Sequence, residues 1–243
     1  MKGLHPGLAI SVLLSTCLLA GCDITRSISV PDNAHWSHGK GTINGDISIG
    51  SGAVVDGDMS TINGDVHAAT GAHVGKLTTV NGDISVDHDA QTGELTNVNG
   101  GIRLGQHATA NGNVTSVNGD IQTGNGVHIQ GDVTDVNGNI ALCAVQAGGD
   151  LRFVNGTVLV KTGSAIKGSV IAKKPKFSSS DELHEPVMII GPHAIVDGPI
   201  TFERPGKLYV SDSAVIHAVN GVTPEKFSGT APSGVTLPTC ADN

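Results

Sequence analysis

The sequence is poor in aromatic residues, and this limits the kind of core that it can build. Phenylalanine, tryptophan and tyrosine make up 2% of its 243 residues, with one tryptophan and one tyrosine. Valine, isoleucine, leucine and alanine must therefore fill the interior, as in a narrow fold with little room for rings.

Charged residues are scarce as well, at 15% of the sequence, and the net charge is −8. A protein that binds nucleic acid through its phosphates needs clustered lysine and arginine, which release counterions on binding. Because the sequence offers no such basic patch, we expect no nucleic-acid partner.

The sequence also has no apolar run long enough to cross a membrane as a helix, which takes about 20 residues. Its best candidate, Leu8 to Ala20, follows the positively charged Lys2 and has the form of a secretory signal. The run ends in Leu19-Ala20-Gly21-Cys22, which resembles the bacterial lipobox. We predict a lipoprotein signal peptide at 1–21 and lipidation of Cys22, with an ordinary signal peptide as the alternative.

Lipidation of Cys22 predicts where the protein resides. Each buried acyl CH₂ contributes ~0.8 kcal/mol, so three acyl chains on one cysteine anchor a protein firmly. In enteric bacteria an aspartate after that cysteine retains lipoproteins at the inner membrane, and Asp23 has this form. We expect a protein of the bacterial cell envelope that faces the periplasm, at the inner membrane or alternatively the outer one. Residues 22–41 then form a lipid-anchored tether.

The dipeptide Asn-Gly recurs seven times at intervals of 18 or 19 residues. Its asparagines are Asn44, Asn63, Asn81, Asn99, Asn118, Asn137 and Asn155. A fixed period of this length is typical of a solenoid, in which each repeat is one supersecondary unit stacked on the next.

The apolar positions within each repeat indicate strands rather than helices. In the unit after Asn118 they include the pair Val127 and Ile129, two residues apart, as expected for one face of a strand. Three short strands with two inward side chains each close one triangular coil. We therefore predict an all-β fold, a single-stranded triangular parallel β-helix of about 18–19 residues per coil, with right-handed winding favoured.

The Asn-Gly pairs mark one corner of the triangle, because both residues tolerate a left-handed backbone. One asparagine per coil predicts a ladder of stacked, partly buried amides, each hydrogen-bonded to the next. A second glycine follows 12 or 13 residues later and marks another corner. These glycines are Gly57, Gly75, Gly93, Gly112, Gly131, Gly149 and Gly168.

The pattern divides the chain into segments. Tandem coils are predicted over 42–172, followed by a protruding loop at 173–186 that breaks the period. The spacing of apolar residues resumes over 187–222, which predicts further irregular coils. Residues 223–243 contain prolines and read as a C-terminal tail.

Two cysteines remain after the signal peptide and the lipidated Cys22 are set aside. They are Cys143, in the coils, and Cys240, in the tail. An exported protein meets an oxidising compartment, so we predict a disulfide that pins the tail against the coil of Cys143. The alternative is a small core residue at Cys143 and a free thiol at Cys240.

The eleven histidines raise the question of a metal site. His73 and His128 share a register but lie three coils apart, ~14 Å, too far to share one ion. His88 and His107 align in neighbouring coils, yet two ligands do not make a zinc site. We expect surface histidines, no cofactor and no catalytic site.

Aspartates recur at both corners: Asp46, Asp65, Asp83 and Asp120 follow the Asn-Gly pair, and Asp58, Asp132 and Asp150 lie at the second corner. Stacked carboxylates repel one another, and calcium would relieve that repulsion. The Gly-Gly-x-Gly-x-Asp calcium repeat is absent, however, and corner aspartates commonly bond their own backbone. Structural calcium therefore stays the less favoured alternative.

Several runs resemble a known family. They are Gly52-Ala53-Val54-Val55-Asp56-Gly57-Asp58-Met59, Gly126-Val127-His128-Ile129-Gln130-Gly131-Asp132-Val133 and Ala194-Ile195-Val196-Asp197-Gly198-Pro199-Ile200. Over about residues 42–220 the chain resembles bactofilins, polymer-forming bacterial scaffold proteins with a right-handed triangular β-helix. The resemblance implies self-assembly. Typical bactofilins are cytoplasmic, without a lipobox, and they lack a long C-terminal extension.

These features favour a non-catalytic, membrane-anchored scaffold or interaction surface, with itself, an envelope polysaccharide or an envelope protein as partner. One alternative is an enzyme, either a hexapeptide-type acyltransferase, with His193 or His217 as its only candidates, or a polysaccharide-active β-helix. A surface adhesin is a further alternative.

Overall fold

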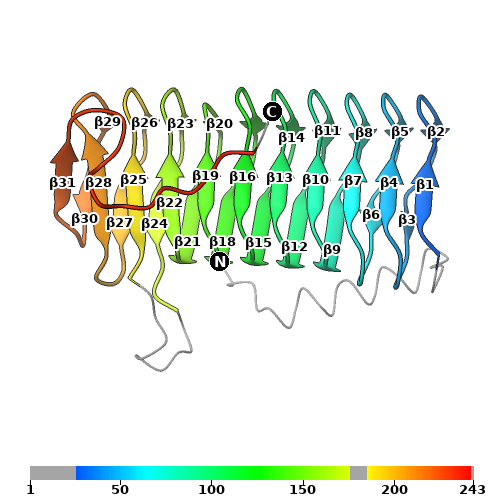
Figure 1. Cartoon of the computed structure of the whole chain (residues 1–243), viewed down its shortest axis with the longest axis horizontal. Coiled ribbons are helices and arrows are strands. Elements are labelled where there is room, and N and C mark those ends of the chain that lie inside the picture. Colours follow the sequence, from blue (N-terminus) through cyan, green and yellow to red (C-terminus); the bar gives the residue numbers. More distant parts are fainter. Residues whose placement is uncertain (1–25, 176–184, 242–243) are drawn as a thin grey trace.

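The chain folds into a parallel β-solenoid, in which three sheets run along one long axis (Figure 1). The structure is a computed structural model and describes residues 26–175 and 185–241. Up to Ala172 successive coils are offset by 18 or 19 residues, as in the pairing of Ile28 with Ile47 and of Val66 with Ile84. Beyond Ala172 the offset varies, as in the pairing of Thr157 with Val187 and of Leu208 with Pro224. The predicted all-β solenoid of triangular coils is confirmed.

The strands of each coil are distributed over three sheets. The first sheet holds β1 (Ile28–Val30), β4 (Ile47–Ile49), β7 (Val66–Ala68), β10 (Ile84–Val86), β13 (Ile102–Leu104), β16 (Ile121–Thr123), β19 (Ile140–Leu142), β22 (Thr157–Val160), β25 (Val187–Ile190), β28 (Lys207–Ser211) and β31 (Pro224–Phe227). The second holds β2 (His35–Trp36), β5 (Val54–Val55), β8 (His73–Val74), β11 (Gln91–Thr92), β14 (Thr109–Ala110), β17 (His128–Ile129), β20 (Gln146–Ala147), β23 (Ala165–Ile166), β26 (Ile195–Val196) and β29 (Val215–Ile216). The third holds β3 (Lys40–Gly41), β6 (Met59–Ser60), β9 (Leu77–Asn81), β12 (Leu95–Asn99), β15 (Val114–Asn118), β18 (Val133–Asn137), β21 (Leu151–Asn155), β24 (Val170–Ala172), β27 (Ile200–Phe202) and β30 (Val219–Asn220).

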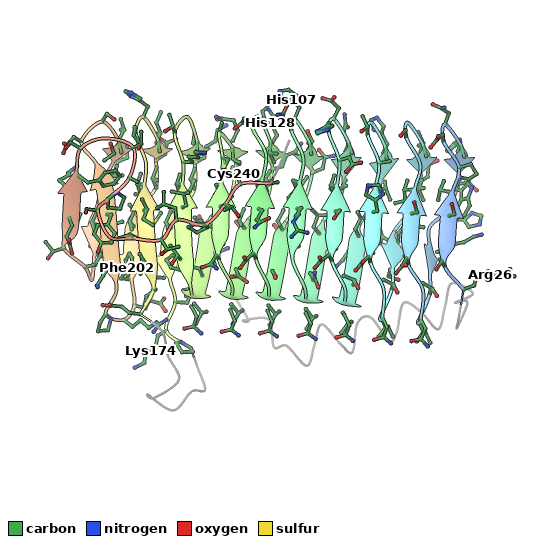
Figure 2. The ribbon with its side chains drawn as sticks, viewed as in Figure 1. Arg26, His107, His128, Lys174, Phe202 and Cys240 are labelled. Carbon is green, nitrogen blue, oxygen red and sulfur yellow. A yellow bond between two sulfur atoms is a disulfide. The ribbon has the colours of Figure 1, made fainter. Side chains whose placement is uncertain are left out.

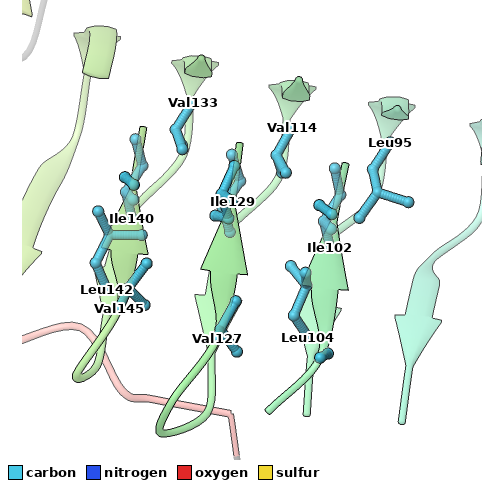
Figure 3. Packing of buried hydrophobic residues seen from close by; sticks show 14 of the residues in the cluster. Leu95, Ile102, Leu104, Val114, Val127, Ile129, Val133, Ile140, Leu142 and Val145 are labelled. Atoms are coloured by element: carbon cyan, nitrogen blue, oxygen red, sulfur yellow. The ribbon is translucent and has the colours of Figure 1, made fainter. Parts of the chain in front are cut away.

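The core is a continuous column of aliphatic side chains inside the coils (Figure 3). Each side of a coil points two side chains inward, because alternate residues of a strand face opposite ways. Aromatic rings are not wholly excluded. Phe153 and Phe202 meet edge to face with ring centroids 6.3 Å apart, and both are buried. The small Ala172 lies between them in the register and makes room.

The corners differ in part from the prediction. Left-handed backbone recurs most regularly between the first and second sheets, at Asn33, Gly52, Gly71, Asp89, His107, Gly126, Ala144, Gly163 and His193. The glycines of the predicted second corner are not left-handed. They are required because coils approach closely there: a Cβ on Gly75 would lie 2.6 Å from the Gly57 carbonyl oxygen. At the Asn-Gly corner, a Cβ on Gly119 would lie 2.1 Å from the Gly100 carbonyl oxygen.

The ends of the solenoid extend beyond the predicted boundaries. Residues 28–41, assigned to the tether, form a coil of three strands, β1 to β3, although they contain no Asn-Gly pair. Residues 224–227, assigned to the tail, form β31, which pairs with β28. Both assignments were wrong because backbone pairing with an adjacent coil can continue where the corner motif has been lost. Most of the predicted loop at 173–186 lies outside the described residues.

Candidate functional site

The seven asparagines of the repeat lie in one column, where each side chain bonds to the next. The Nδ2 atoms of Asn63, Asn81, Asn99, Asn118, Asn137 and Asn155 donate to Oδ1 of the preceding asparagine at 2.6–3.0 Å. Arg204 ends the column, since its Nη2 donates to Oδ1 of Asn155 at 2.8 Å. Most of these asparagines are exposed, so the expectation of partly buried amides was wrong.

Because the asparagine side chains of the ladder are mostly exposed to water, each one contributes little to the stability of the fold. Asn118 donates at 3.0 Å and accepts at 2.9 Å, but water can replace both partners when its amide is removed. We expect Asn118→Ala to lower the free energy of unfolding by about 1 kcal/mol, measured by chemical denaturation. Asn125→Ala, at an exposed position of another corner, is the matched control. A loss above about 3 kcal/mol would mean that the ladder acts through more than these two bonds.

The corner aspartates have a structural role that needs no metal ion. Oδ1 of Asp46, Asp65, Asp83, Asp120, Asp58, Asp132 and Asp150 each accepts a backbone N–H of the following coil, at 2.7–3.0 Å. The bond thus joins two coils, instead of closing on the residue's own backbone as expected. Within residues 26–175 and 185–241, no group of three or more His, Cys, Asp or Glu side chains could hold a metal ion.

The histidines of the described residues lie on the surface, and three of them pair with an aspartate of an adjacent coil. The pairs are His35 with Asp56 at 2.6 Å, His67 with Asp87 at 3.0 Å, and His107 with Asp89 at 3.6 Å. All six side chains are more than 40% exposed, so each pair contributes little to stability.

One alignment of histidines was wrong. His107 shares its corner position with Asp89, not with His88. The error arose because the extra residue of this 19-residue coil lies between Ala110 and Val114, after His107 and before the next strand. The alignment of His73 with His128 is confirmed, since Gln91 and Thr109 lie between them in the register.

Open hollows lie on the surface of the described residues, and two of them bear on the candidate residues. One, of about 680 Å³, lies over the loop from Phe202 to Gly206; the other, of about 300 Å³, crosses the corner at Gly57 and Gly75. Neither of these two is lined by His193 or His217, the two candidates for an acyltransferase base. Beside the first hollow, Lys173 donates to Glu203 at 2.7 Å and holds the pKa of that carboxyl below its usual range.

The C-terminal segment, residues 228–241, forms what we call the tail strap. It leaves β31 and runs back across the first sheet toward β19 and β16 (Figure 1). Cys240 is joined to Cys143 by a disulfide across a sequence separation of 97, with a Cα–Cα distance of 6.0 Å. Figure 2 places Cys240 several coils away from β31.

Hydrogen bonds hold the end of the tail strap beside the disulfide. The backbone N–H of Ala241 donates to the Thr123 carbonyl oxygen at 3.2 Å, and Gln122 Nε2 donates to Thr239 Oγ1 at 3.4 Å. Pro232 and Ala241 of the strap are themselves buried. The strap is therefore packed onto the solenoid.

Three outward-facing residues of the first sheet are apolar and buried. We call Ala141, Leu159 and Ile189 the outer stripe; they are 0%, 5% and 1% exposed. They follow one another in the register of β19, β22 and β25, and the interior core cluster does not include them. The strap crosses these strands, which explains why outward side chains there are shielded from water (Figure 1).

The outer stripe was missed in the sequence, although a signal was present. On earlier coils the equivalent outward position is polar, as at Ser85, Arg103 and Gln122. In β19, β22 and β25 this alternation is lost, and the strands are apolar on both faces. Apolar side chains on both faces of a strand indicate a second covering layer.

No family model, curated protein or solved structure is significantly similar to this chain. Residues 1–21 and Cys22 lie outside the described residues. Within the described part of the chain, no helix is sufficiently long and apolar to cross a membrane.

Proposed function

We propose that the protein is a lipid-anchored, non-catalytic solenoid that serves as a scaffold or interaction surface in the bacterial cell envelope, on the periplasmic side of a membrane. The lipobox-like Leu19-Ala20-Gly21-Cys22 supports the anchor. A coil of three strands begins only six residues after Cys22, at Ile28, so the anchor would hold the first coil close to the membrane surface.

One observation favours a structural role most strongly. The polar residues that recur along the repeat are used to join coils: the asparagines bond to one another, and the aspartates accept backbone N–H groups. Side chains held in this way add rigidity and are not available as a nucleophile and base in a cleft. A rigid rod with regular faces suits a role in which position and surface matter more than chemistry.

Self-assembly is the finer part of this proposal. The resemblance to bactofilins implies it, and the ends of the solenoid support it. Among the described residues, β1 pairs only with β4 and β31 only with β28, so each terminal strand has one edge without a strand partner. Unpaired strand edges favour pairing with another chain.

Electron microscopy of the purified domain 23–243 tests the proposed scaffold. Filaments would support a self-assembling scaffold, and a monomeric rod would support a surface that binds other envelope components. Compact trimers would contradict both, because hexapeptide-type acyltransferases form trimers. In that case His193→Ala and His217→Ala are the variants to assay for acyl transfer.

The anchor has its own test. Cys22→Ser should prevent lipidation, leave the signal peptide uncleaved at this site and remove the mature lipoprotein from the membrane fraction. Globomycin, which blocks cleavage of lipoprotein precursors, should have the same effect on maturation of the wild type. Cys17→Ser, within the signal peptide, is the matched control and should mature normally. Mature, membrane-bound protein in the Cys22→Ser strain would refute the lipoprotein assignment.

A further inference from the structure

One inward position of the third sheet is polar in six successive coils. Its residues, which we call the interior polar column, are Thr42, Thr61, Thr79, Asn97, Ser116 and Asp135. Each of them is at most 1% exposed. Phe153 occupies the same position in the next coil and ends the column.

The next four members of the interior polar column after Thr42 act as hydrogen-bond donors to the Asn-Gly corner, and Thr42 Oγ1 donates to the Arg26 carbonyl oxygen at 3.0 Å. The bonds run from Thr61 Oγ1 to Gly45 O, from Thr79 Oγ1 to Gly64 O, from Asn97 Nδ2 to Gly82 O and from Ser116 Oγ to Gly119 O, all at 2.9 Å. Corner carbonyls are acceptors, so this position requires a side chain that can donate.

Asp135 is the exception, because an ionised carboxylate can only accept. It is 0% exposed and is the one ionisable side chain that is buried within the described residues. Among those residues neither of its oxygens has a hydrogen-bond partner. A Cβ placed on Gly138 would lie 2.4 Å from the Gly119 carbonyl oxygen and 2.8 Å from Asp135 Oδ2, so two acceptors converge on this corner.

We propose that Asp135 is a neutral carboxylic acid in the folded protein, donates its proton to a corner carbonyl as its column neighbours do, and makes the middle of the solenoid a pH-sensitive element. Protonation converts the side chain from an acceptor into a donor and removes an unpaired buried charge. Ionisation makes the side chain an acceptor again and restores the unpaired buried charge. That charge opposes the packing of this coil against the coils on either side. This inference rests on the interior of the coils and is independent of the proposed function.

The surroundings of Asp135 favour the neutral form. Burial raises the pKa of this carboxyl from 3.8 to about 8, and the negative charge of Asp120 adds to the rise. The Val136 N–H lies near enough to offset part of this effect, without the geometry of a hydrogen bond. The column neighbours Ser116 and Phe153 are uncharged, so neither compensates a carboxylate.

The sign of the pH dependence follows from these pKa values. Between about pH 4 and pH 8 the folded chain retains a proton on Asp135 that the unfolded chain has lost. Rising pH therefore destabilises the fold over this range, by about tenfold in the unfolding constant for each pH unit. Above the folded pKa the dependence ends.

The test compares the full chain in detergent with its Asp135→Asn variant by chemical denaturation from pH 5 to pH 9. Asparagine occupies the equivalent position at Asn97 and donates there to two carbonyls, so the variant should fold and lose this tenfold-per-unit slope. Asp197→Asn, which alters an exposed carboxylate, should keep the slope of the wild type. Equal slopes for wild type and Asp135→Asn would overturn the proposal.

Infrared spectroscopy gives a second readout that does not depend on stability. At pH 7 the wild type should show the band of a protonated carboxyl group, and this band should shift to that of a carboxylate near pH 8. If Asp135→Asn does not fold, Asp135→Ser replaces it in the denaturation series, because serine donates from the same position at Ser116. A wild-type spectrum without a protonated carboxyl at pH 7 would refute the proposal by itself.

Discussion

Replacing Ile129 with aspartate is expected to abolish the folded solenoid. Ile129 is 1% exposed and points into the interior, where its register neighbours Ala110 and Ala147 are both small (Figure 3). An aspartate there would bury a carboxyl group, charged or protonated, in an aliphatic column without a hydrogen-bond partner, at a cost of about 5 kcal/mol or more. That is comparable with the whole stability of a typical domain. Circular dichroism and thermal melting should show a largely unfolded chain.

The neighbouring residue supplies the control. His128 is exposed on the outer face of the same strand, so His128→Ala should change the free energy of unfolding by less than about 0.5 kcal/mol. Ile129→Val keeps the core aliphatic and should cost about 1 kcal/mol, which gives a measurable folded variant. A larger loss for His128→Ala than for Ile129→Val would mean that His128 has a ligand or a buried role. The account of an inert outer face would then be wrong.

Loss of the Cys143–Cys240 disulfide is expected to have the second-largest effect. The bond closes a loop across a sequence separation of 97, and removing such a cross-link costs about 3–5 kcal/mol by chain-entropy arguments. It should also release the tail strap and expose Leu159 and Ile189 to water. We expect a lower melting temperature after reduction, increased binding of a hydrophobic dye, and protease cleavage within residues 228–241.

Non-reducing mass spectrometry of the purified protein should first show one intramolecular bridge between these cysteines. We then expect the same loss of stability in the reduced wild type and in the variants Cys143→Ser, Cys240→Ser and the double substitution. Each of these four proteins lacks the same single disulfide bond. Two freely alkylating thiols in the oxidised protein would contradict the bridge. Reduced protein with unchanged dye binding would show that the tail strap stays in place without it.

The repeat was readable from the sequence because it is local and periodic. An apolar residue occupies the inward position of Ile129 in most coils, although Thr92 holds it in one, and the step of two between Val127 and Ile129 distinguishes a strand from a helix. The 18–19-residue period then determines which residues stack. For the same reason the column from Asn44 to Asn155 could be predicted as a ladder.

Residues outside the repeat were predicted less well. The coil over 28–41 has no Asn-Gly pair, so the corner motif gave no signal, although Ile28 and Val30 face inward like Ile47 and Ile49. The position of Asp135 also carried no warning. An aspartate in a short strand is not unusual by itself. Only the neighbouring coils show that this position faces inward and requires a hydrogen-bond donor, which an ionised carboxylate is not.

The sequence by itself determined the coil, its period, the inward aliphatic positions and the stacking of the corner residues. Each of these depends on contacts between residues about one coil apart, and the repeat period directly predicts which residues make those contacts. The tertiary structure alone decided the path of the tail strap, the burial of the outer stripe and the isolation of Asp135. These depend on contacts that do not repeat, such as those that bury Leu159 and Ile189, and on how closely the coils approach one another. A periodic pattern carries no information about a contact that occurs once.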